Sequence, residues 1–590
     1  MAAFLGVLVR IGWGWGSGVG GTDLGTREGR TMKTEDPPRS GVAGRPAASG
    51  EPAVSAGQSV SGGAPRSDGQ AVSGGAPLSA GPAGPAVSAG RQRLIVVAVC
   101  LGMAMSFVEV TAAIATLQPI QREYAVAPGD LSWVSSLYAL VVAALVLSGG
   151  ALGDRLGRRA VFLAGVGAMV AGDLVVATAG GFGQVLVGRA ISGLGGALIL
   201  PTSLAILVVT FANPAVRARM IAVWVSASGL GLALGPLLGA LVVRGAGWHA
   251  AYLINLPVAV ATVAVTWFAV TESRMPGRRL DVPGQLLAVA GLGSLVYGIA
   301  VGGRESYTEP MVAGALLLAV LCLAGFVLVE RRRAAPMFDL ALLREARPAV
   351  ALLVAGIGLF GFVGVSYLQI LYLQRVDGFD PLGAAVRLLA LTLSFLVATV
   401  AVGALAGRIP AARLLLTGLL AAGAGALALL AEDPGSPYWR AALALGLTGL
   451  GCGLVVAPST AAALAVVPPP RAPGASAAVT VFRQLGSVFG TAVLGAVLAR
   501  RFAGELPDAL RDAGVPAPAA DAVTSAVASG RTGSSGNAAI GDAIDAAFTS
   551  GVHTALAVAA GTFLLGAALV AAVLLRPARP AQSPAPPISR

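Results

Sequence analysis

Four charged side chains fall within the ten-residue segment GALGDRLGRR at 150–159, between two long apolar stretches. They are Asp154, Arg155, Arg158 and Arg159. Charge is costly inside a lipid bilayer, so this segment predicts a tight turn at a membrane surface, and its arginines place the turn on the cytoplasmic side. A charge cluster that pairs in one state of the protein and separates in another would act as a latch. The alternative is an anchor that only fixes the topology.

Two acids and an arginine lie inside apolar stretches, where ionisable residues are rare and usually functional. A carboxyl at Glu109 must be paired or protonated there, so it could exchange a proton for another solute. The alternative is that Glu109 is a structural partner of Arg189 or Arg483. Asp173 could extend a proton path or pair with an arginine, and the sequence favours neither.

Arg189 keeps its proton, so it is a fixed charge within its apolar stretch. It lies about one turn of helix from the start of that stretch. A role in proton coupling is one interpretation. The alternative is that its side chain extends to the membrane interface.

Gly231, Gly235 and Gly239 recur every four residues and therefore share one face of a helix, with Pro236 beside them. Small residues at this spacing let two helix backbones approach closely, and the proline kinks the helix. We expect a tightly packed helix face here.

The composition is typical of a membrane protein. Hydrophobic residues make up 56% of the chain and charged residues 12%, with a mean hydropathy of +0.81. The apolar stretches lack the alternation of barrel strands and are about 20 residues long, as membrane-spanning helices are. The net charge of +12 comes from arginines between these stretches, so we expect no nucleic-acid partner.

Patterns of soluble enzymes are missing from the sequence. We find no G-x-x-x-x-G-K-[S/T] segment, no G-x-S-x-G segment and no paired-histidine metal motif. Cys100, Cys322 and Cys452 lie within apolar stretches, so we expect neither a disulfide framework nor a metal site. The sequence therefore predicts a protein that is not an enzyme and that binds no metal or cofactor.

About fourteen apolar spans of near 20 residues follow one another from residue 94 onward. An even number of spans puts both tails on one side. Most arginines between the spans also lie on that side, which marks it as the cytoplasm. The expected spans are 94–117, 131–152, 160–179, 184–208, 219–243, 250–270, 283–302, 310–330, 349–373, 382–406, 411–431, 440–464, 475–499 and 553–575.

The remaining segments are expected to be tails and loops. Residues 1–93 are rich in Gly, Ala, Ser and Pro and predict a disordered cytoplasmic tail, and 577–590 a second, short one. A signal peptide or a true start at Met32 are alternatives for the first residues. Residues 500–552 predict one external loop, in which 538–548 forms an amphipathic helix on the membrane surface.

Taken together, these motifs resemble those of the major facilitator superfamily, and specifically its fourteen-span drug:proton antiporter branch. The segment GALGDRLGRR is similar to the pattern G-x-L-x-D-R-x-G-R-R, with Gly150 and Gly157 at its glycine positions. LVGRAISGLGGA at 186–197 resembles the span 4 pattern with an intramembrane arginine, with Ser192 in place of the usual Gln. GLALGPLLGA at 231–240 resembles the span 5 pattern G-x-x-x-G-P-x-x-G.

The first span adds a further likeness. VEVTAAIATLQPIQ at 108–121 resembles the pattern L-D-x-T-I-V-N-V-A-L-P-x-I-Q, with Glu109 at the acidic position and Thr111 at the threonine. Ile114 and Gln118 replace the usual Asn and Pro, which affects the polarity of the pocket and the kink at the end of this span.

Two later segments also resemble the branch. FRQLGSVFG at 482–490 is similar to R-Q-x-G-x-x-x-G and adds Arg483 and Gln484 to the polar residues inside the membrane. Arg483 lies near the cytoplasmic start of its span, where a structural or gating role is expected rather than substrate contact. WHAAYLINLP resembles the start of span 6, and its Asn255 is expected to be structural.

The resemblance implies an all-α polytopic membrane protein with two pseudo-symmetric six-helix halves, 94–270 and 349–576. Two inserted helices and a cytoplasmic linker would occupy 271–348. It also implies that Glu109 and Arg189 act on protons, that the segment 150–159 gates transport, and that the span 5 glycine face packs against the second half. Asp173, which lies where the family more often has a small polar residue, is a further candidate for proton coupling.

The function implied is a proton-coupled antiporter that exports small organic compounds across the cytoplasmic membrane by alternating access. Its partners would be protons, a small-molecule substrate and the lipid bilayer, and it would work as a monomer without cofactors. The alternatives are a proton-coupled importer or uniporter of the same superfamily and, more remotely, a non-transporting receptor on the same scaffold.

Overall fold

The computed structural model describes residues 88–126, 130–274, 281–302, 306–333, 340–405, 408–465, 467, 472–528 and 538–576. The tails expected at 1–93 and 577–590 lie outside these ranges, except that the first helix already begins at Ala89. The described residues contain helices and connecting turns but no strand, which confirms the expected all-α fold.

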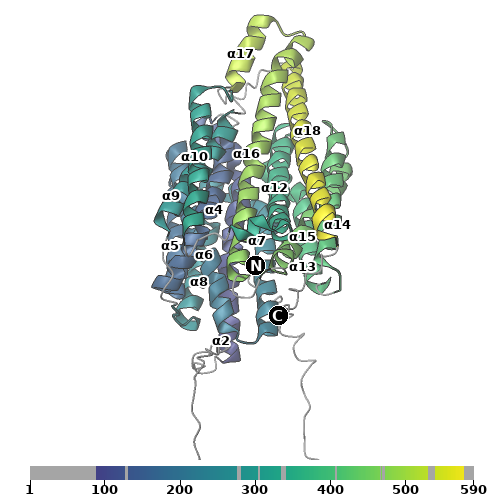
Figure 1. Ribbon diagram of the computed structural model, residues 1–590. Coiled ribbons are helices and arrows are strands. Elements are labelled where there is room, and N and C mark those ends of the chain that lie inside the picture. The colour runs from purple at the N-terminus through teal and green to yellow at the C-terminus, as the bar shows by residue number, and fades with distance from the viewer. Residues whose placement is uncertain are drawn as a thin grey trace, which may run out of the picture. The chain divides into compact units, whose positions relative to one another are not determined.

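The first half of the chain and the insertion follow the expected order of spans (Figure 1). The first half consists of α2 (Ala89–Ala112), η1 (Ala113–Thr116), α3 (Leu117–Tyr124), α4 (Leu131–Leu156), α5 (Arg158–Ala177), α6 (Phe182–Thr210), α7 (Pro214–Ala251), η2 (Tyr252–Ile254) and α8 (Asn255–Ala269). The insertion consists of α9 (Val282–Gly302), α10 (Pro310–Arg332) and the short α11 (Ala341–Arg344).

The second half continues the same all-helical pattern. It consists of α12 (Ala346–Arg375), α13 (Pro381–Leu405), α14 (Ala411–Ala428), η3 (Leu429–Ala431), α15 (Tyr438–Leu464), α16 (Ala472–Asp512), α17 (Ala517–Ala528), α18 (Ala538–Leu569) and η5 (Val570–Leu574).

Among the described residues, 13 helices are long and apolar enough to cross a membrane. One of them, Arg219–Ala269, has 51 residues and therefore exceeds the length of a single span. Gly247 inside it has the non-helical angles φ 82° and ψ 170°, a conformation that glycine adopts at little cost. This segment holds two of the expected spans, 219–243 and 250–270, so the helix count agrees with the sequence.

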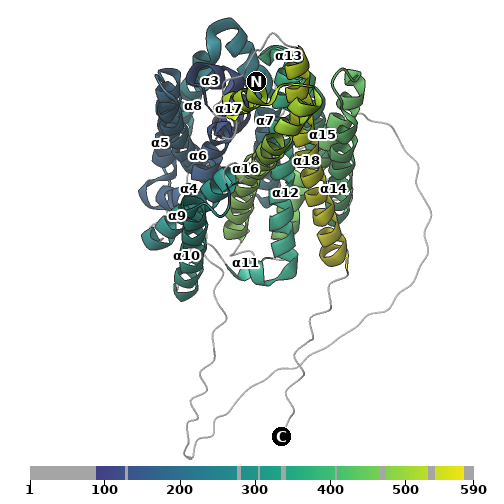
Figure 2. The same cartoon turned by 90° about the horizontal axis from the view of Figure 1, so that it is seen from above.

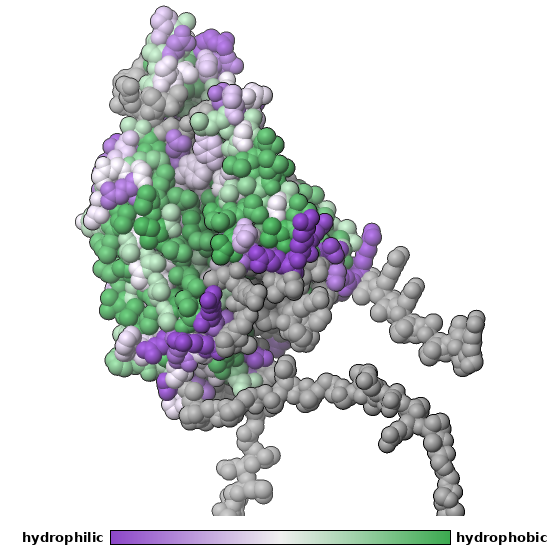
Figure 3. All heavy atoms as spheres, turned by 60° about the vertical axis from the view of Figure 1, so that its left-hand side comes forward, coloured by the Kyte–Doolittle hydropathy of each residue, from purple (hydrophilic) through white to green (hydrophobic). Residues whose placement is uncertain are grey.

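Apolar side chains cover the outside of the helices, as expected for a surface that contacts lipid. Figure 3 shows a broad apolar region with hydrophilic residues gathered above and below it. Large side chains such as Phe268, Met311 and Leu443 are exposed on the helices. In the inserted helix α10, only 11% of the most apolar 18-residue stretch is buried, so this helix faces lipid along most of its length.

The inserted helix α9 packs on α10 and contacts both α4 and α16 (Figure 1, Figure 2). Ser148 of α4 is hydrogen-bonded to Gln285 of α9, and the rings of Trp133 and Tyr297 lie 6.4 Å apart. The insertion therefore lies beside one helix from each half.

The two halves contact each other through α4 with α16 and through α7 with α13. The hydroxyl oxygens of Ser136 and Thr491 are 2.6 Å apart. Ala115, Ala240 and Ala385 form a second buried contact. Both contacts lie toward the helix ends that the sequence assigns to the external side.

The structure differs from the sequence in the expected external loop at 500–552. Helix α16 continues to Asp512, α17 follows, and α18 runs unbroken from Ala538 into the last span. The prediction of a separate surface helix at 538–548 is therefore wrong. Its apolar face is buried against protein, with the rings of Phe548 and Phe502 5.7 Å apart, and the sequence alone cannot distinguish protein from lipid as the covering surface.

The contact between α4 and α16 can be tested by cross-linking. A chain with Ser136→Cys and Thr491→Cys, in which the native cysteines are replaced, is expected to form a disulfide on mild oxidation, because the two hydroxyl oxygens are 2.6 Å apart. Mass spectrometry of the peptides would detect the bond, and each single variant is the control. Two reactive but unlinked cysteines would contradict this arrangement of the halves.

Candidate functional site

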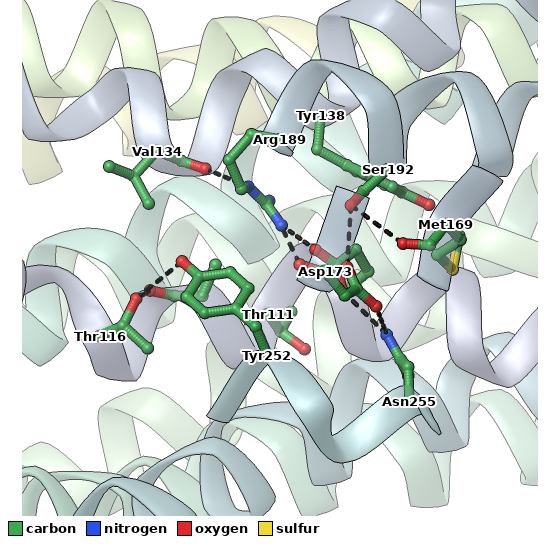
Figure 4. Close-up of polar contacts among 12 residues, drawn as sticks. Thr111, Thr116, Val134, Tyr138, Met169, Asp173, Arg189, Ser192, Tyr252 and Asn255 are labelled. Carbon is green, nitrogen blue, oxygen red and sulfur yellow. Dashed lines mark hydrogen bonds and ion pairs between the residues drawn. The ribbon is translucent and has the colours of Figure 1, made fainter. Parts of the chain in front are cut away.

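A buried ion pair joins α2 to α6 (Figure 4). Glu109 is 4% exposed and Arg189 is fully buried. Arg189 donates from Nη1 to the Glu109 carboxylate and from Nε to the backbone carbonyl of Val134 in α4, the latter at 2.7 Å. The partner of Glu109 is thus Arg189 rather than Arg483. The alternative that Arg189 extends to the interface is wrong, because its guanidinium is enclosed by three helices.

Two tyrosine rings flank the guanidinium of Arg189. Its Cζ atom lies 5.3 Å from the ring centre of Tyr138 and 5.8 Å from that of Tyr252, within the range of cation–π attraction. Tyr138 donates its hydroxyl to the carbonyl of Ser106 at 2.9 Å, and Tyr252 is hydrogen-bonded to Thr116 at 3.0 Å. Neither tyrosine was predictable from the sequence, because a single aromatic residue in an apolar span forms no pattern.

Asp173 of α5 belongs to the same network. Ser192 of α6 donates to Asp173 Oδ1 at 2.8 Å. Asn255 donates from Nδ2 to Glu109 Oε2 at 2.8 Å and to Asp173 Oδ2 at 3.4 Å. The structure therefore brings together the three residues expected to act on protons, and it adds Asn255, which the sequence indicated only as structural. Ser192 provides a hydrogen bond at the position where the family pattern has Gln.

A small pocket, with room for about one water molecule, borders Glu109. Thr116, Tyr252 and Asn255 line it together with apolar residues of α2 and η2. Beyond Glu109, α2 gives way to the 3-10 turn η1, and such turns within a span often mark hinges. The first span is thus irregular even though Gln118 replaces the proline of the family pattern.

The cytoplasmic segment 150–159 forms a turn between α4 and α5. Gly157 has φ 121°, which favours glycine, and Arg158 donates to Asp154 Oδ1 from Nε at 3.1 Å and from Nη2 at 2.8 Å. Arg155 is exposed, and Gly150 lies in α4, where an added β-carbon would be 3.4 Å from Pro201.

The start of α5 is capped by a residue from outside the segment 150–159. The carboxylate of Glu272, in the segment after α8, accepts the backbone N–H groups of Arg159 and Ala160, each at 3.1 Å. An anion at this position is stabilised by the free N–H groups and the helix dipole. The guanidinium of Arg159 lies 4.8 Å from the ring centre of Trp267. The turn is thus held by the segment after α8, which sequence spacing cannot reveal.

The glycine face of α7 packs against α2, so the expectation that it packs against the second half is wrong. A β-carbon added at Gly231 would lie 2.5 Å from the carbonyl oxygen of Ala104, and one at Gly239 2.7 Å from that of Ala112. A β-carbon at Gly235 would overlap Thr111 Oγ1. Helical spacing shows that the three glycines share a face, but it does not identify the helix that this face meets.

Pro236 lies within α7 beside this glycine face. The second half contacts a different position of α7, Gly229, where an added β-carbon would be 3.5 Å from Thr399 of α13. One helix therefore contacts both α2 and the second half.

Arg483 and Gln484 lie in α16, apart from the network around Glu109. Arg483 donates to Thr460 Oγ1 at 2.8 Å and to the carbonyl of Val456, both in α15 near Pro458. Gln484 is 1% exposed, and its Oε1 has no hydrogen-bond partner in the described part of the chain. These contacts agree with a structural role of Arg483 between two helices of the second half.

A second buried acid, which the sequence analysis missed, lies in the loop between η3 and α15. Glu432 is 8% exposed and accepts a hydrogen bond from Gln369 Nε2 at 2.9 Å. Burial raises the pKa of Glu432 to about 7, the hydrogen bond from Gln369 opposes this shift, and the charge of Asp377 adds to it. A single acid near a span end looks like an ordinary loop residue in the sequence.

The packing of α2 on α7 generates a stability prediction. Gly235→Ala is expected to destabilise the purified protein by about 1–3 kcal/mol, because the new methyl group overlaps Thr111. Gly229→Ala on the same helix is the control, since its β-carbon would meet Thr399 at 3.5 Å. Thermal unfolding in detergent would compare the two. Equal melting temperatures for both variants would contradict the close approach.

The raised pKa of Glu432 generates a pH prediction. The folded protein binds this proton more tightly than an exposed Glu does, so Glu432 lowers stability as the pH rises from about 4.5 to about 7. Glu432→Gln is expected to raise the melting temperature at about pH 8 and to have little effect at about pH 4.5. The shift corresponds to at most about 3 kcal/mol. Asp508→Asn, at an acid whose side chain is 63% exposed, is the control. A gain that does not depend on pH would oppose this account.

Comparison with known proteins identifies the family of this chain. Residues 98–491 match the family model of the Major Facilitator Superfamily. A multidrug resistance protein, Stp, from Mycobacterium tuberculosis is 34% identical over 428 residues, which cover 72% of this chain and 79% of Stp. The drug efflux pump JefA from the same species is 33% identical, over 81% of this chain and 97% of JefA. The tetracenomycin C resistance and export protein of Streptomyces glaucescens is 29% identical, over 83% and 93%.

Solved structures show the same fold at lower identity. A bacterial homologue of the human lysosomal transporter Spinster, in an inward-facing and occupied conformation, has a TM-score of 0.53 and 18% identity, over 82% of this chain and 97% of that one. The human organic anion transporter MFSD10 has a TM-score of 0.52 and 17% identity, over 81% and 99%. The chain therefore belongs to the Major Facilitator Superfamily of membrane transporters and not to a family of enzymes.

Proposed function

We propose that this protein exports small organic molecules, such as drugs or antibiotics, in exchange for protons by alternating access. The names of its relatives, which refer to multidrug resistance, drug efflux and antibiotic export, support this substrate class. The protein would lie in the cytoplasmic membrane with both ends of the chain in the cytoplasm, where the arginine-rich loops belong. A single chain would be the working unit.

The buried pair of Glu109 and Arg189 is the observation that carries this proposal. Arg189 is a fixed charge, and Glu109 is a carboxyl that can hold or release a proton in the same low-dielectric site. When Glu109 binds a proton its attraction to Arg189 is lost, so the geometry of α2 and α6 becomes sensitive to protonation. The adjoining pocket gives Glu109 a neighbouring space for a water molecule, through which a proton could reach or leave the carboxyl.

The available energy is sufficient for export. A membrane potential contributes about 2.3 kcal/mol per charge for each 100 mV. A pH difference adds about 1.4 kcal/mol per unit. One proton moving inward could therefore sustain a ratio of substrate concentrations across the membrane on the order of tens to one.

Contacts at both ends of the helices support alternating access. The pairs Ser136–Thr491 and Ala240–Ala385 bring the halves together toward the external side. At the other end, the cluster of Asp154, Arg158 and Glu272 would hold the turn before α5 in this state and rearrange in the opposite one. Such a change of packed interfaces is typical of transporters with two repeats.

Transport by purified protein in sealed liposomes tests this function. The probes are ethidium and a panel of antibiotics. The native protein is expected to carry protons down an imposed pH gradient, and to release them, as substrate moves in the opposite direction. Glu109→Gln is expected to abolish this release and to lower gradient-driven transport at least about tenfold, because the acid that carries the proton is missing.

Glu309→Gln, at an exposed acid before α10, is the matched control and is expected to transport normally. Correct insertion of both variants is checked by their yield and by a single peak in size-exclusion chromatography. Undiminished proton-driven transport by Glu109→Gln would eliminate Glu109 as the carrier. Absence of transport for every probe would refute the export function itself.

A further inference from the structure

The network around Arg189 contains more acid than base. Glu109 is 4% exposed, Asp173 is 3% exposed and Arg189 is fully buried. In the described parts of the chain, the only cation that forms an ion pair with either carboxyl is Arg189. The other groups in contact, including Tyr138 of α4 and Tyr252 of η2, are neutral. With both acids ionised, the site would therefore carry one uncompensated negative charge.

An uncompensated charge in such a site is costly, because the surrounding helices replace water with apolar groups. A single proton on either carboxyl removes this charge and leaves one carboxylate for Arg189. The two carboxyl groups lie beside each other, because both accept a hydrogen bond from the same amide nitrogen of Asn255. Two carboxylates this close repel each other unless one of them holds a proton. The charge balance and the geometry thus lead to the same occupancy.

The amide of Asn255 connects the two acids. Its Nδ2 atom lies 2.8 Å from Glu109 Oε2 and 3.4 Å from Asp173 Oδ2, and the residue is 3% exposed. Asn255 is the first residue of α8, directly after the 3-10 turn η2. The regular backbone on both sides therefore holds the Cα atom of Asn255 in place. An amide donates two N–H groups without adding charge, and it can therefore serve both carboxyl groups at once.

We infer that Glu109 and Asp173 form one site that holds a single proton between them, and that Asn255 is the positioning residue that keeps the two carboxyl groups side by side. This inference deepens the proposed function, on which its role in transport rests. Proton uptake forms one O–H bond on a carboxylate oxygen, and release breaks that bond and returns the proton to water. Ser192 donates a hydrogen bond to the other carboxylate oxygen of Asp173, at 2.8 Å.

A shared proton makes a distinctive prediction for single variants. Asp173→Asn leaves Glu109 alone with Arg189, and Glu109→Gln leaves Asp173 alone with Arg189. Either change balances the charge without a proton. Both variants are therefore expected to lose the bound proton near neutral pH, whereas independent acids would lose it in only one of them.

Infrared difference spectroscopy of the full-length protein in lipid nanodiscs can detect this proton directly. All chains carry Glu432→Gln, because the pKa of Glu432 is about 7 and its own band would otherwise overlap. The chain that keeps both Glu109 and Asp173 is expected to show the C=O band of one protonated carboxyl near neutral pH, which disappears at alkaline pH and shifts in D₂O. Asp173→Asn and Glu109→Gln are both expected to lack the band. Thr262→Val, at a buried threonine of α8 that bonds to Val258, is the control and should keep it.

The role of Asn255 has its own readout. Asn255→Leu removes the donor to both carboxylates, so the midpoint of the infrared titration is expected to rise by about one pH unit. Asn255→Ser also removes the bridge and should shift the midpoint in the same direction, which covers the case in which the leucine variant does not fold. Thr262→Val is expected to leave the midpoint unchanged.

Three outcomes would overturn the inference: no protonated carboxyl in the Glu432→Gln chain that keeps both Glu109 and Asp173, a band retained in either acid variant, or unchanged midpoints in both Asn255 variants. The spectra need no substrate, so they are separate from the test of export. A shared proton in a protein that moves no solute would leave this site standing and refute the proposed function. Proton-driven export with a band retained in Asp173→Asn would support the proposed function and refute the shared site.

Discussion

The ion pair between Arg189 and Glu109 is the constraint on which the first half of the structure depends. An arginine cannot lose its proton, so a fully buried guanidinium must find a counter-charge and hydrogen-bond acceptors among its neighbours. It obtains them from α2 and from the carbonyl of Val134 in α4. These partners lie far apart in the sequence, and the charge at Arg189 can be satisfied only when three helices pack around it. The tyrosines and Asn255 complete that enclosure.

Close helix packing makes this network possible. A β-carbon added at Gly172 would lie 2.4 Å from the backbone nitrogen of Ser192, and one at Gly195 2.5 Å from that of Met169, so α5 and α6 are in backbone contact. This approach brings Asp173, next to Gly172, within reach of Ser192. The glycine face of α7 does the same for α2, the helix that carries Glu109. In a membrane, where lipid is as apolar as the side chains, such small-residue contacts are a main source of helix association.

The sequence was sufficient for the fold and for part of the site. Apolar spans of uniform length and the arginines between them predicted the helices, and the rarity of charge inside spans indicated Glu109, Asp173 and Arg189. The contacts between distant segments were not predictable in the same way. Asn255 and Glu272 are ordinary polar residues until the fold places one beside two buried acids and the other at the start of α5. Likewise, periodicity put Gly231 and Gly235 on one face but could not show that α2 covers it.

The position of α7 connects these observations to the second half of the protein. Thr111, two residues beyond Glu109, lies against Gly235, while Gly229 on another face of α7 contacts Thr399 of α13. A helix packed without side chains between its backbone and α2 cannot stay in place if α2 shifts, because there is no flexible layer to absorb the movement. Direct contact therefore runs from the acid in α2 through α7 to α13. In this arrangement the glycines give α7 its direct backbone contact with α2, although they do not themselves form the interface between the halves.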